Sequence, residues 1–386
     1  MKIASQPFWL VGFRPFFTLA CLAGMFMPVA WAMVYAGSLP APDTRFTPVQ
    51  WHAHEMFFGF GWAVLGGFLL TATKNWVSIR GYHGPALMLL AAAWILERIA
   101  MSCGGSWPPL LFVLAINAFL GSIVVMLLWT LIRHRKTDDY RDNGFFLVAL
   151  PAFIVAKQLM LDGSHFHAGY MMTLALFRVA FLVMLERTLT QFMRNTFKVE
   201  ILRNAWLDRA IKLLGLVLVL EPFLPPLPGA SLSLLLAGLL LWRFLYWKPL
   251  LAFPRIELGV MYIGYLAIAA QLVVEAIDRT TGLAWTGALS VHLFSFGVMG
   301  MIIPGMLIRI SKGHTGHKVT FDTLDRAVLW LMLGAFALRI AVPQLAPTSY
   351  RLWIELAAAC WFACFATIAW RYVPYLLRAR IDGKEH

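Results

Sequence analysis

Five of the ten histidines fall at the edges or in the interior of long apolar stretches. His52 and His54 form a His-x-His pair near the start of one stretch, His165 and His167 lie in a turn between two others, and His292 lies inside a further one. An ionisable group inside a membrane is costly and marks a functional site by default. Imidazole is the usual protein ligand for haem iron and copper. This distribution predicts a metal or haem layer near one face of a membrane.

The spacing of His52 and His54 restricts how they share a metal. Successive helical residues turn by about 100°, so residues i and i+2 point about 200° apart. In a regular helix the two imidazoles serve centres on opposite faces, or one ligates while the other orients it; a frayed first turn would let both reach one metal. The alternative for any one histidine is a hydrogen bond to a carbonyl group or a place at the membrane interface.

Two charged residues join the predicted site. Glu55 directly follows His54, and we expect it to assist proton delivery from the outer face of the membrane. Arg178 lies near the middle of an apolar stretch, where either a haem propionate or a buried glutamate would satisfy it. Most other buried glutamates are expected to pair with cations inside the helices. These cations are Arg98, Lys157, Arg178 and Arg339.

Small and soft residues leave two interpretations open. Glycines follow the histidines on both stretches and would let either a flat macrocycle or another helix approach closely. Cys360 and Cys364 stand at i and i+4, which places both thiols on one helix face. They suit either Cu(I) or apolar packing. The glycines concerned are Gly59, Gly61, Gly66, Gly67, Gly297 and Gly300.

The composition indicates which elements position these residues. The chain has 386 residues, of which 60% are hydrophobic and only 13% charged, and its mean hydropathy is +0.73. Soluble domains carry roughly 25% charged residues, so a soluble fold could not cover its surface with this set. Four cysteines in apolar settings are too few for a disulfide framework. The composition therefore predicts an all-α, polytopic integral membrane protein.

Apolar stretches long enough to cross a bilayer recur along the whole chain. No break between them is long enough for a soluble domain, so we expect one transmembrane domain over 1–386 with a short cytoplasmic tail at 375–386. About twelve helices are predicted, at 14–36, 49–73, 84–102, 108–132, 143–162, 168–191, 207–225, 230–248, 256–277, 284–308, 325–343 and 350–374.

The basic residues predict the orientation. With the N-terminus and every second connection assigned to the cytoplasm, those segments contain 25 of the 32 Lys and Arg residues. The opposite connections contain only Arg45, Arg279 and Arg351. This asymmetry predicts an N-in, C-in topology. It also explains the net charge of +13 as an excess spread over cytoplasmic loops, which argues against nucleic-acid binding.

Three motifs resemble the NnrS family of membrane proteins. The first is Phe13-Arg14-Pro15-Phe16-Phe17, and the second is the run from Trp51 to Phe60, continued by Gly67 to Ala72 and Asn75-Trp76. The third is His292 in a glycine-bearing helix that closes in Arg309 and Gly313-His314-Thr315-Gly316. The resemblance spans nearly the whole chain and the same number of helices.

The resemblance implies a haem- and copper-containing protein of the bacterial inner membrane that takes part in nitric oxide metabolism and nitrosative stress. Its site residues correspond to His52, His54, Glu55, His292 and His314. Two positions depart from the family pattern, at Leu185-Glu186-Arg187-Thr188 and at Met261-Tyr262. A ligand is therefore expected to have moved, to His165 or His167. No Cys-x-x-Cys-His motif exists, so the haem is expected to be non-covalent and b-type.

Three functions follow from this combination. The first is an oxidoreductase similar to nitric oxide reductase, which takes electrons from an unidentified donor. The second is a non-catalytic haem protein that senses or sequesters nitric oxide. The third is a transporter, which would require an inverted repeat and broken helices at the midplane.

Overall fold

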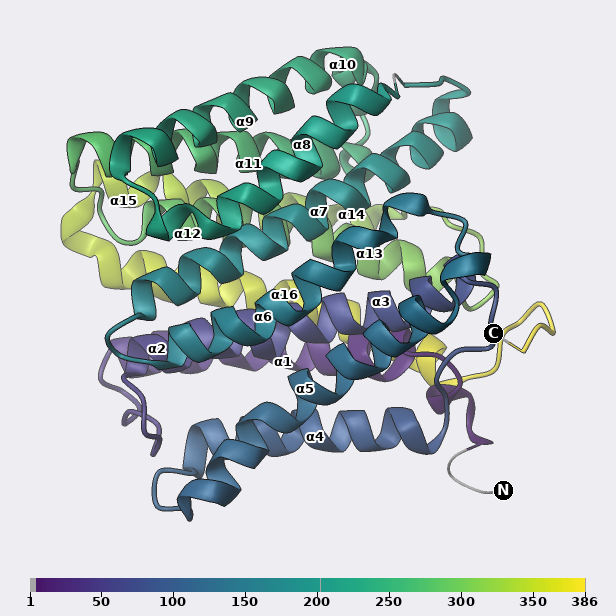
Figure 1. Cartoon of the computed structure of the whole chain (residues 1–386), viewed down its shortest axis with the longest axis horizontal. Coiled ribbons are helices and arrows are strands. Elements are labelled where there is room, and N and C mark those ends of the chain that lie inside the picture. The colour runs from purple at the N-terminus through teal and green to yellow at the C-terminus, as the bar shows by residue number, and fades with distance from the viewer. Residues whose placement is uncertain (1–4, 202, 386) are drawn as a thin grey trace. The chain divides into compact units, whose positions relative to one another are not determined.

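The structure, a computed structural model, describes residues 5–201 and 203–385; residues 1–4, 202 and 386 lie outside this description. Every regular element in these ranges is a helix (Figure 1). Besides four short 3₁₀ helices at 7–9, 135–137, 141–145 and 347–349, the elements are α1 (Phe13–Tyr35), α2 (Pro48–His54), η3 (Glu55–Gly61), α3 (Trp62–Trp76), α4 (Pro85–Cys103), α5 (Pro109–Arg133), α6 (Phe146–Leu161), α7 (Phe166–Phe197), α8 (Ala205–Val217), η6 (Leu218–Phe223), α9 (Pro226–Tyr246), α10 (Pro249–Ala252), α11 (Ile256–Thr281), α12 (Leu289–Phe294), η7 (Ser295–Met299), α13 (Gly300–Gly313), α14 (Thr323–Ile340), α15 (Val342–Leu345) and α16 (Tyr350–Leu377).

Eleven of the helical segments in the described ranges are long and apolar enough to cross a membrane. Each coincides with one of the twelve predicted segments, which confirms a polytopic all-α membrane protein. The remaining prediction, at 207–225, corresponds to α8 followed by the 3₁₀ segment η6, which contains Pro222. Proline cannot continue the α-helical hydrogen bonding, so this segment is helical in two shorter pieces.

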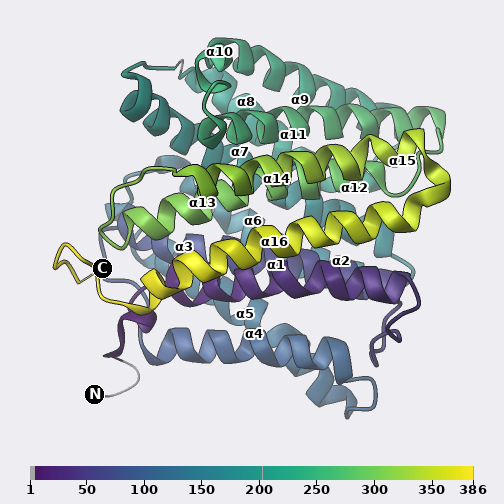
Figure 2. The same ribbon diagram turned by 180° about the vertical axis from the view of Figure 1, so that it is seen from behind.

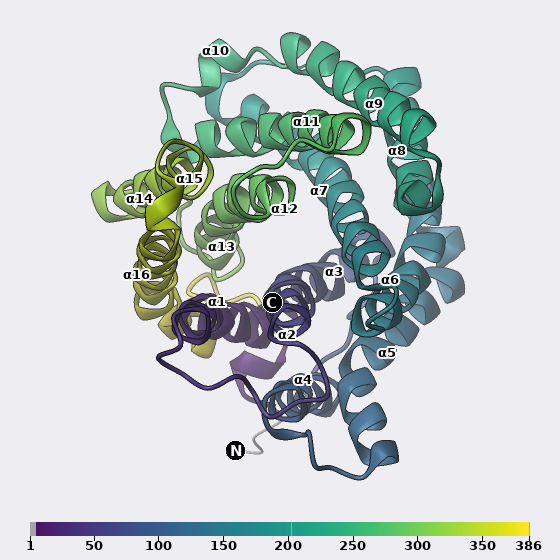
Figure 3. The same ribbon diagram turned by 90° about the vertical axis from the view of Figure 1, so that its left-hand side faces the viewer.

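The chain divides into two compact units, and each is described by itself. Unit 1 comprises residues 1–169, 307–320 and 365–386, and unit 2 comprises residues 170–306 and 321–364. In unit 1, α1 packs on α3 and α4 packs on α5, as the rear view shows (Figure 2). In unit 2, α11 contacts α9, α12 and α14 (Figure 3). The single-domain expectation for 1–386 stays a prediction.

The motif at the start of α1 ties the two ends of unit 1 together. Arg14 is fully buried, and its Nη1 donates hydrogen bonds to the carbonyl oxygens of Leu376 (2.8 Å) and Arg378 (2.6 Å). The last carbonyls of a helix have no partner within the helix. Arg14 therefore caps the C-terminus of α16, so the first and last predicted spans have their terminal ends on the same side.

We expect Arg14→Met to loosen this end of the protein. The substitution keeps the length of the side chain but removes two hydrogen bonds from a charged donor, each worth about 1.5–3 kcal/mol. Hydrogen–deuterium exchange at residues 375–385 should accelerate, and the thermal midpoint in detergent should fall. Arg80→Met is the matched control, because Arg80 forms a largely exposed pair with Glu385. Equal exchange rates in the two variants would contradict the capping role.

Two membrane helices contain a π-helical turn close to a predicted histidine. The turn η3 begins at Glu55, directly after His54, and η7 begins at Ser295, three residues after His292. A π-turn inserts a residue into the helical ladder and is frequent at functional sites. The helices that carry His54 and His292 are therefore both irregular directly after these histidines.

Candidate functional sites

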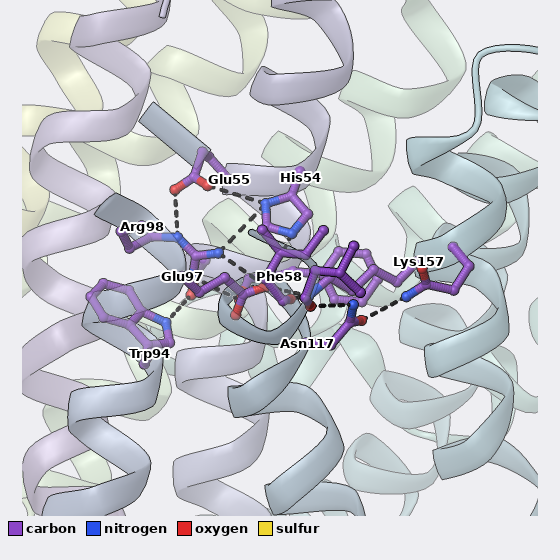
Figure 4. A network of polar contacts seen from close by, with 12 residues as sticks. His54, Glu55, Phe58, Trp94, Glu97, Arg98, Asn117 and Lys157 are labelled. Carbon is purple, nitrogen blue, oxygen red and sulfur yellow. Dashed lines mark hydrogen bonds and ion pairs between the residues drawn. The ribbon is translucent and has the colours of Figure 1, made fainter. Parts of the chain in front are cut away.

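The first candidate site consists of His54, Glu55, Glu97, Arg98 and Lys157, which we call the His54 cluster (Figure 4). All five residues belong to unit 1, and none of their side chains is more than 8% exposed. The cluster joins α2, η3, α4 and α6. Ionisable side chains this deeply buried must pair with one another.

Local sequence places His54 in this cluster. Helix α2 begins with Pro48 after a capping box between Thr47 and Gln50, so its start is well defined. The amide of Gln50 also donates to two carbonyl oxygens at the end of α6, at 3.1 and 3.3 Å. These bonds fasten α2 to the helix that carries Lys157.

His54 lies between two carboxylates. Its Nδ1 is 3.1 Å from Oε1 of Glu55, and its Nε2 is 3.1 Å from Oε1 of Glu97. A neutral imidazole has one N–H and a carboxylate has none, so the two contacts need one additional proton, on His54 or on a glutamate. A metal ion at His54 would have to displace one carboxylate; the other would then orient the ring, as carboxylates do for metal-bound histidines.

Two cations balance these carboxylates. Nε of Arg98 is 2.7 Å from Oε2 of Glu55, and its Nη2 is 3.5 Å from Oε1 of Glu97. Nζ of Lys157 contacts Glu97 and the carbonyl oxygen of Ile116. The expectation that in-helix cations neutralise buried glutamates is confirmed here. Glu55 is itself part of an ion pair, and its proton-delivery role stays a prediction.

The π-turn η3 is held by side chains of α4. Nε1 of Trp94 donates to the carbonyl oxygen of Gly59 at 3.0 Å, and Nη1 of Arg98 donates to that of Phe58 at 3.4 Å. The irregular backbone after His54 thus has specific partners, which buried backbone groups require.

His52 has a different environment from His54. Its ring stacks on Trp31 of α1, with ring centroids 4.3 Å apart and planes inclined by 13°. Helix α2 is regular over these residues. The geometric prediction that the two imidazoles diverge in a regular helix is therefore confirmed, and this pair does not face one shared centre.

The second candidate site contains His292 and lies in unit 2. The sequence placed His292 about eight residues inside its helix, which was wrong, because α12 begins only at Leu289, after Gly287 with a φ of 72°. His292 is therefore in the first turn. Its Nδ1 donates to the carbonyl oxygen of Ala288 at 2.7 Å, and its Nε2 accepts from Nη2 of Arg339 at 3.2 Å. This tautomer leaves the lone pair on Nε2.

Arg178 is linked to the beginning of the same helix. Its Nη1 donates to Oε1 of Gln271 at 2.8 Å and lies 3.5 Å from Oε2 of Glu275. Gln271 in turn donates to Oγ of Ser290 at 3.0 Å, two residues before His292. The sequence left a buried glutamate and a propionate open as partners of Arg178, and the glutamate is present.

The guanidinium of Arg178 also has an unused edge. Arg178 is fully buried, yet its Nε and Nη2 have no hydrogen-bond partner. These two N–H groups form the fork that binds a carboxylate through two parallel hydrogen bonds. A haem ligated by His292 would have to displace Arg339 from Nε2, and this edge of Arg178 would then bind one of its propionates.

The described side chains do not form a comparable site for copper. Over the described ranges, no group of three or more His, Cys, Asp or Glu side chains has the arrangement of a metal site. Cys364 is buried and Cys360 half-buried. The copper ligands expected from the resemblance stay predictions.

The remaining predicted ligands lie elsewhere in unit 1. His165 and His167 are exposed, and Nδ1 of His165 contacts Asp162. His314 follows the end of α13. Burial and the cations Arg380, Lys74 and Arg14 lower the pKa of His314 to about 4. These cations also disfavour a metal cation, so the geometry adds no support for His314 as a ligand.

The glycines next to the histidines serve helix packing. A Cβ at Gly66 would lie 2.6 Å from Ile123, and one at Gly67 would lie 2.7 Å from Phe16. In unit 2, a Cβ at Gly297 would lie 2.6 Å from Ala267. Side chains of neighbouring helices therefore lie directly against these three glycines, which favours the packing interpretation for them.

Sequence reasoning missed the polar residues that orient the second site. Gln271, Ser290 and Tyr350 are uncharged, and Tyr350 accepts a hydrogen bond from Arg339 at 2.9 Å. One signal was available for Gln271: it stands four residues before Glu275, so both lie on one face of α11. The sequence offered no comparable signal for Ser290 or Tyr350.

Comparison with known proteins adds a family assignment. The family model described as NnrS protein matches residues 7–380. No curated protein matches the chain.

Proposed function

The chain belongs to the NnrS family, and on that premise we propose that it binds haem through His292 and handles nitric oxide within a bacterial inner membrane. Membership of this family links the chain to the nitric oxide response. The observation that supports the proposal most directly is the buried, unused edge of Arg178, on the hydrogen-bonded chain that leads to the helix of His292.

Each residue of this site has a distinct role in the proposal. His292 would supply Nε2 to the iron, and its hydrogen bond to the carbonyl oxygen of Ala288 fixes the tautomer. Arg178 would bind a propionate; Gln271 accepts a hydrogen bond from the guanidinium and is itself held by a hydrogen bond to Ser290. The haem supplies a site at which nitric oxide, a small uncharged molecule that enters from lipid, can bind. Reduction would combine two nitric oxide molecules, two protons and two electrons into nitrous oxide and water.

The test starts with the purified full-length chain. A pyridine haemochrome assay and metal analysis should show non-covalent b-type haem, and the spectrum should show a Soret band. Its absence would overturn the proposal. Anaerobic incubation with nitric oxide and an artificial electron donor then separates two functions: release of nitrous oxide supports reduction, and a stable nitrosyl spectrum without nitrous oxide supports sensing or sequestration.

A further inference from the structure

Three polar side chains lie around the ring of Phe13 at the beginning of α1, in unit 1. Cζ of Arg14 is 5.7 Å from the centroid of this ring, and the centroid of the His314 ring is 5.3 Å from it. The amide of Phe13 donates to Oγ1 of Thr71 at 2.9 Å, and Lys74 stands three residues later on the same face of α3. We call Arg14, Lys74 and His314 the Arg14 cluster.

The side-chain nitrogens of the Arg14 cluster that could bind a ligand lack acceptors among the residues that the structure describes. Nε and Nη2 of Arg14 are buried and have no hydrogen-bond partner. Lys74 is 8% exposed, and its ammonium group forms no hydrogen bond or ion pair with residues 5–201 or 203–385. In the same part of the chain, the half-buried imidazole of His314 contacts the ring of Phe13 and has no hydrogen bond. Buried polar groups are nearly always hydrogen-bonded, so these nitrogens are available to an acceptor from outside the chain.

The charges of Arg14 and Lys74 have no carboxylate in contact with them in the described ranges. Nη1 of Arg14 donates to backbone carbonyl oxygens, which carry no full charge. The two carboxylates of the C-terminal tail are already paired, in Arg380–Asp382 and Arg80–Glu385, each with a shortest N–O distance of 2.6 Å. Glu385 therefore attracts Lys74 only from a longer distance. Two buried positive charges without a contacting anion are costly, and a bound anion offsets that cost.

A phosphate group matches this set of donors. The edge formed by Nε and Nη2 of Arg14 binds an oxyanion through two parallel hydrogen bonds, and the ammonium group of Lys74 adds a compact charge. Burial and the nearby cations lower the pKa of His314 to about 4, so its neutral ring adds one N–H donor. A phosphate has more oxygens to share among these donors than the two of a carboxylate. Lys74 and His314 retain exposed atoms, and Arg14 is the fully buried member of the cluster.

We propose that the Arg14 cluster is an anion site that binds one phosphate group, either the headgroup of an anionic phospholipid or inorganic phosphate. The cluster lies at the end of unit 1 where α1 begins and α16 ends, which the basic residues predict to be cytoplasmic. A membrane surface and soluble phosphate both occur on that side. His314, which the sequence predicted as a metal ligand, thus donates to an anion. The site lies in unit 1 and does not rest on haem binding at His292 in unit 2.

Thermal midpoints of the purified full-length protein in a neutral detergent test this site with two probes. Native mass spectrometry first establishes that the protein carries no phospholipid. Sodium phosphate is compared with sodium chloride at equal ionic strength, and mixed micelles of phosphatidylglycerol are compared with phosphatidylcholine, whose headgroup has no net charge. A ligand that binds only the folded protein raises the midpoint, so at least one probe should do so saturably in the wild type.

Two variants make the test specific. Lys74→Gln should raise the Kd of the effective probe about ten-fold or more, because it removes a hydrogen bond from a charged donor. It should not lower the midpoint without ligand, since the lost charge had no counter-ion in contact. His314→Leu changes no charge and should also weaken binding, which separates a specific site from general attraction to basic residues. Lys136→Gln, the matched control, removes an exposed lysine of the same unit and should bind like the wild type.

The outcomes decide both the site and the source of the phosphate. A shift with sodium phosphate identifies inorganic phosphate as a ligand, and a shift with phosphatidylglycerol alone identifies the lipid headgroup. The proposal is overturned if neither probe stabilises the wild type, or if Lys74→Gln and His314→Leu both respond as the wild type does. If one variant does not fold, the other one decides by the same criterion.

Discussion

Replacing His292 with alanine should remove one haem from the purified protein and abolish its Soret absorption if only that haem is bound. The reason is the tautomer: Nδ1–H donates to Ala288, so Nε2 carries the lone pair that would bind iron once Arg339, which donates to it at 3.2 Å, has turned away. Without this imidazole the iron would have no ligand from His292, and Arg178 would offer only hydrogen bonds to a propionate. Haem per polypeptide, measured by pyridine haemochrome assay, should fall by one equivalent.

Two further substitutions make this result specific. His165→Ala removes an exposed imidazole that contacts Asp162, and it should leave haem content unchanged. Arg178→Gln should weaken haem binding without changing the ligand, so the spectral positions stay while the affinity falls. Unchanged haem stoichiometry in His292→Ala would eliminate His292 as a ligand and transfer the assignment to His52 or His54.

The spans could be predicted because bilayer crossing depends on local composition. Twenty or so apolar residues span the hydrocarbon wherever they occur, so composition alone places a helix such as α5 or α11. The cap of α16 by Arg14 was not predictable in this way. It depends on a contact between residues more than 360 positions apart, and no local pattern indicates which carbonyl group an arginine reaches.

The site could be predicted in its residue types and only partly in its partners. The divergence of His52 and His54 follows from helical geometry and holds in the structure. The partner of Lys157 does not follow from the sequence, because Glu97 reaches it from another helix. The π-turns after His54 and His292 were also unpredicted, since an inserted residue leaves no mark in an apolar pattern.

Glu97→Gln should destabilise the protein more than any other single neutralisation in the His54 cluster. Lys157 is fully buried and directly contacts Glu97, a carbonyl oxygen and the ring of Phe58. Without Glu97 its charge loses the carboxylate that it touches, and breaking a buried pair in this way costs about 3–5 kcal/mol. Lys157→Met should cost less, because Glu97 keeps Arg98 and His54. Thermal midpoints and detergent-unfolding free energies measure both effects.

The double variant Glu97→Gln/Lys157→Met decides whether the loss is electrostatic. Removing both charges leaves no buried ion unpaired, so the double variant should recover most of the stability lost in Glu97→Gln. Glu355→Gln provides the scale for an exposed pair with Arg351 and should cost no more than about 0.5 kcal/mol. If the double variant is no more stable than Glu97→Gln, the two residues act independently, and packing rather than charge accounts for the effect. If the double variant recovers the lost stability, the cost of Glu97→Gln comes from the buried charge of Lys157 that has lost its carboxylate. The ion pair between Lys157 and Glu97 then stabilises the charged groups beside His54 in the interior of unit 1.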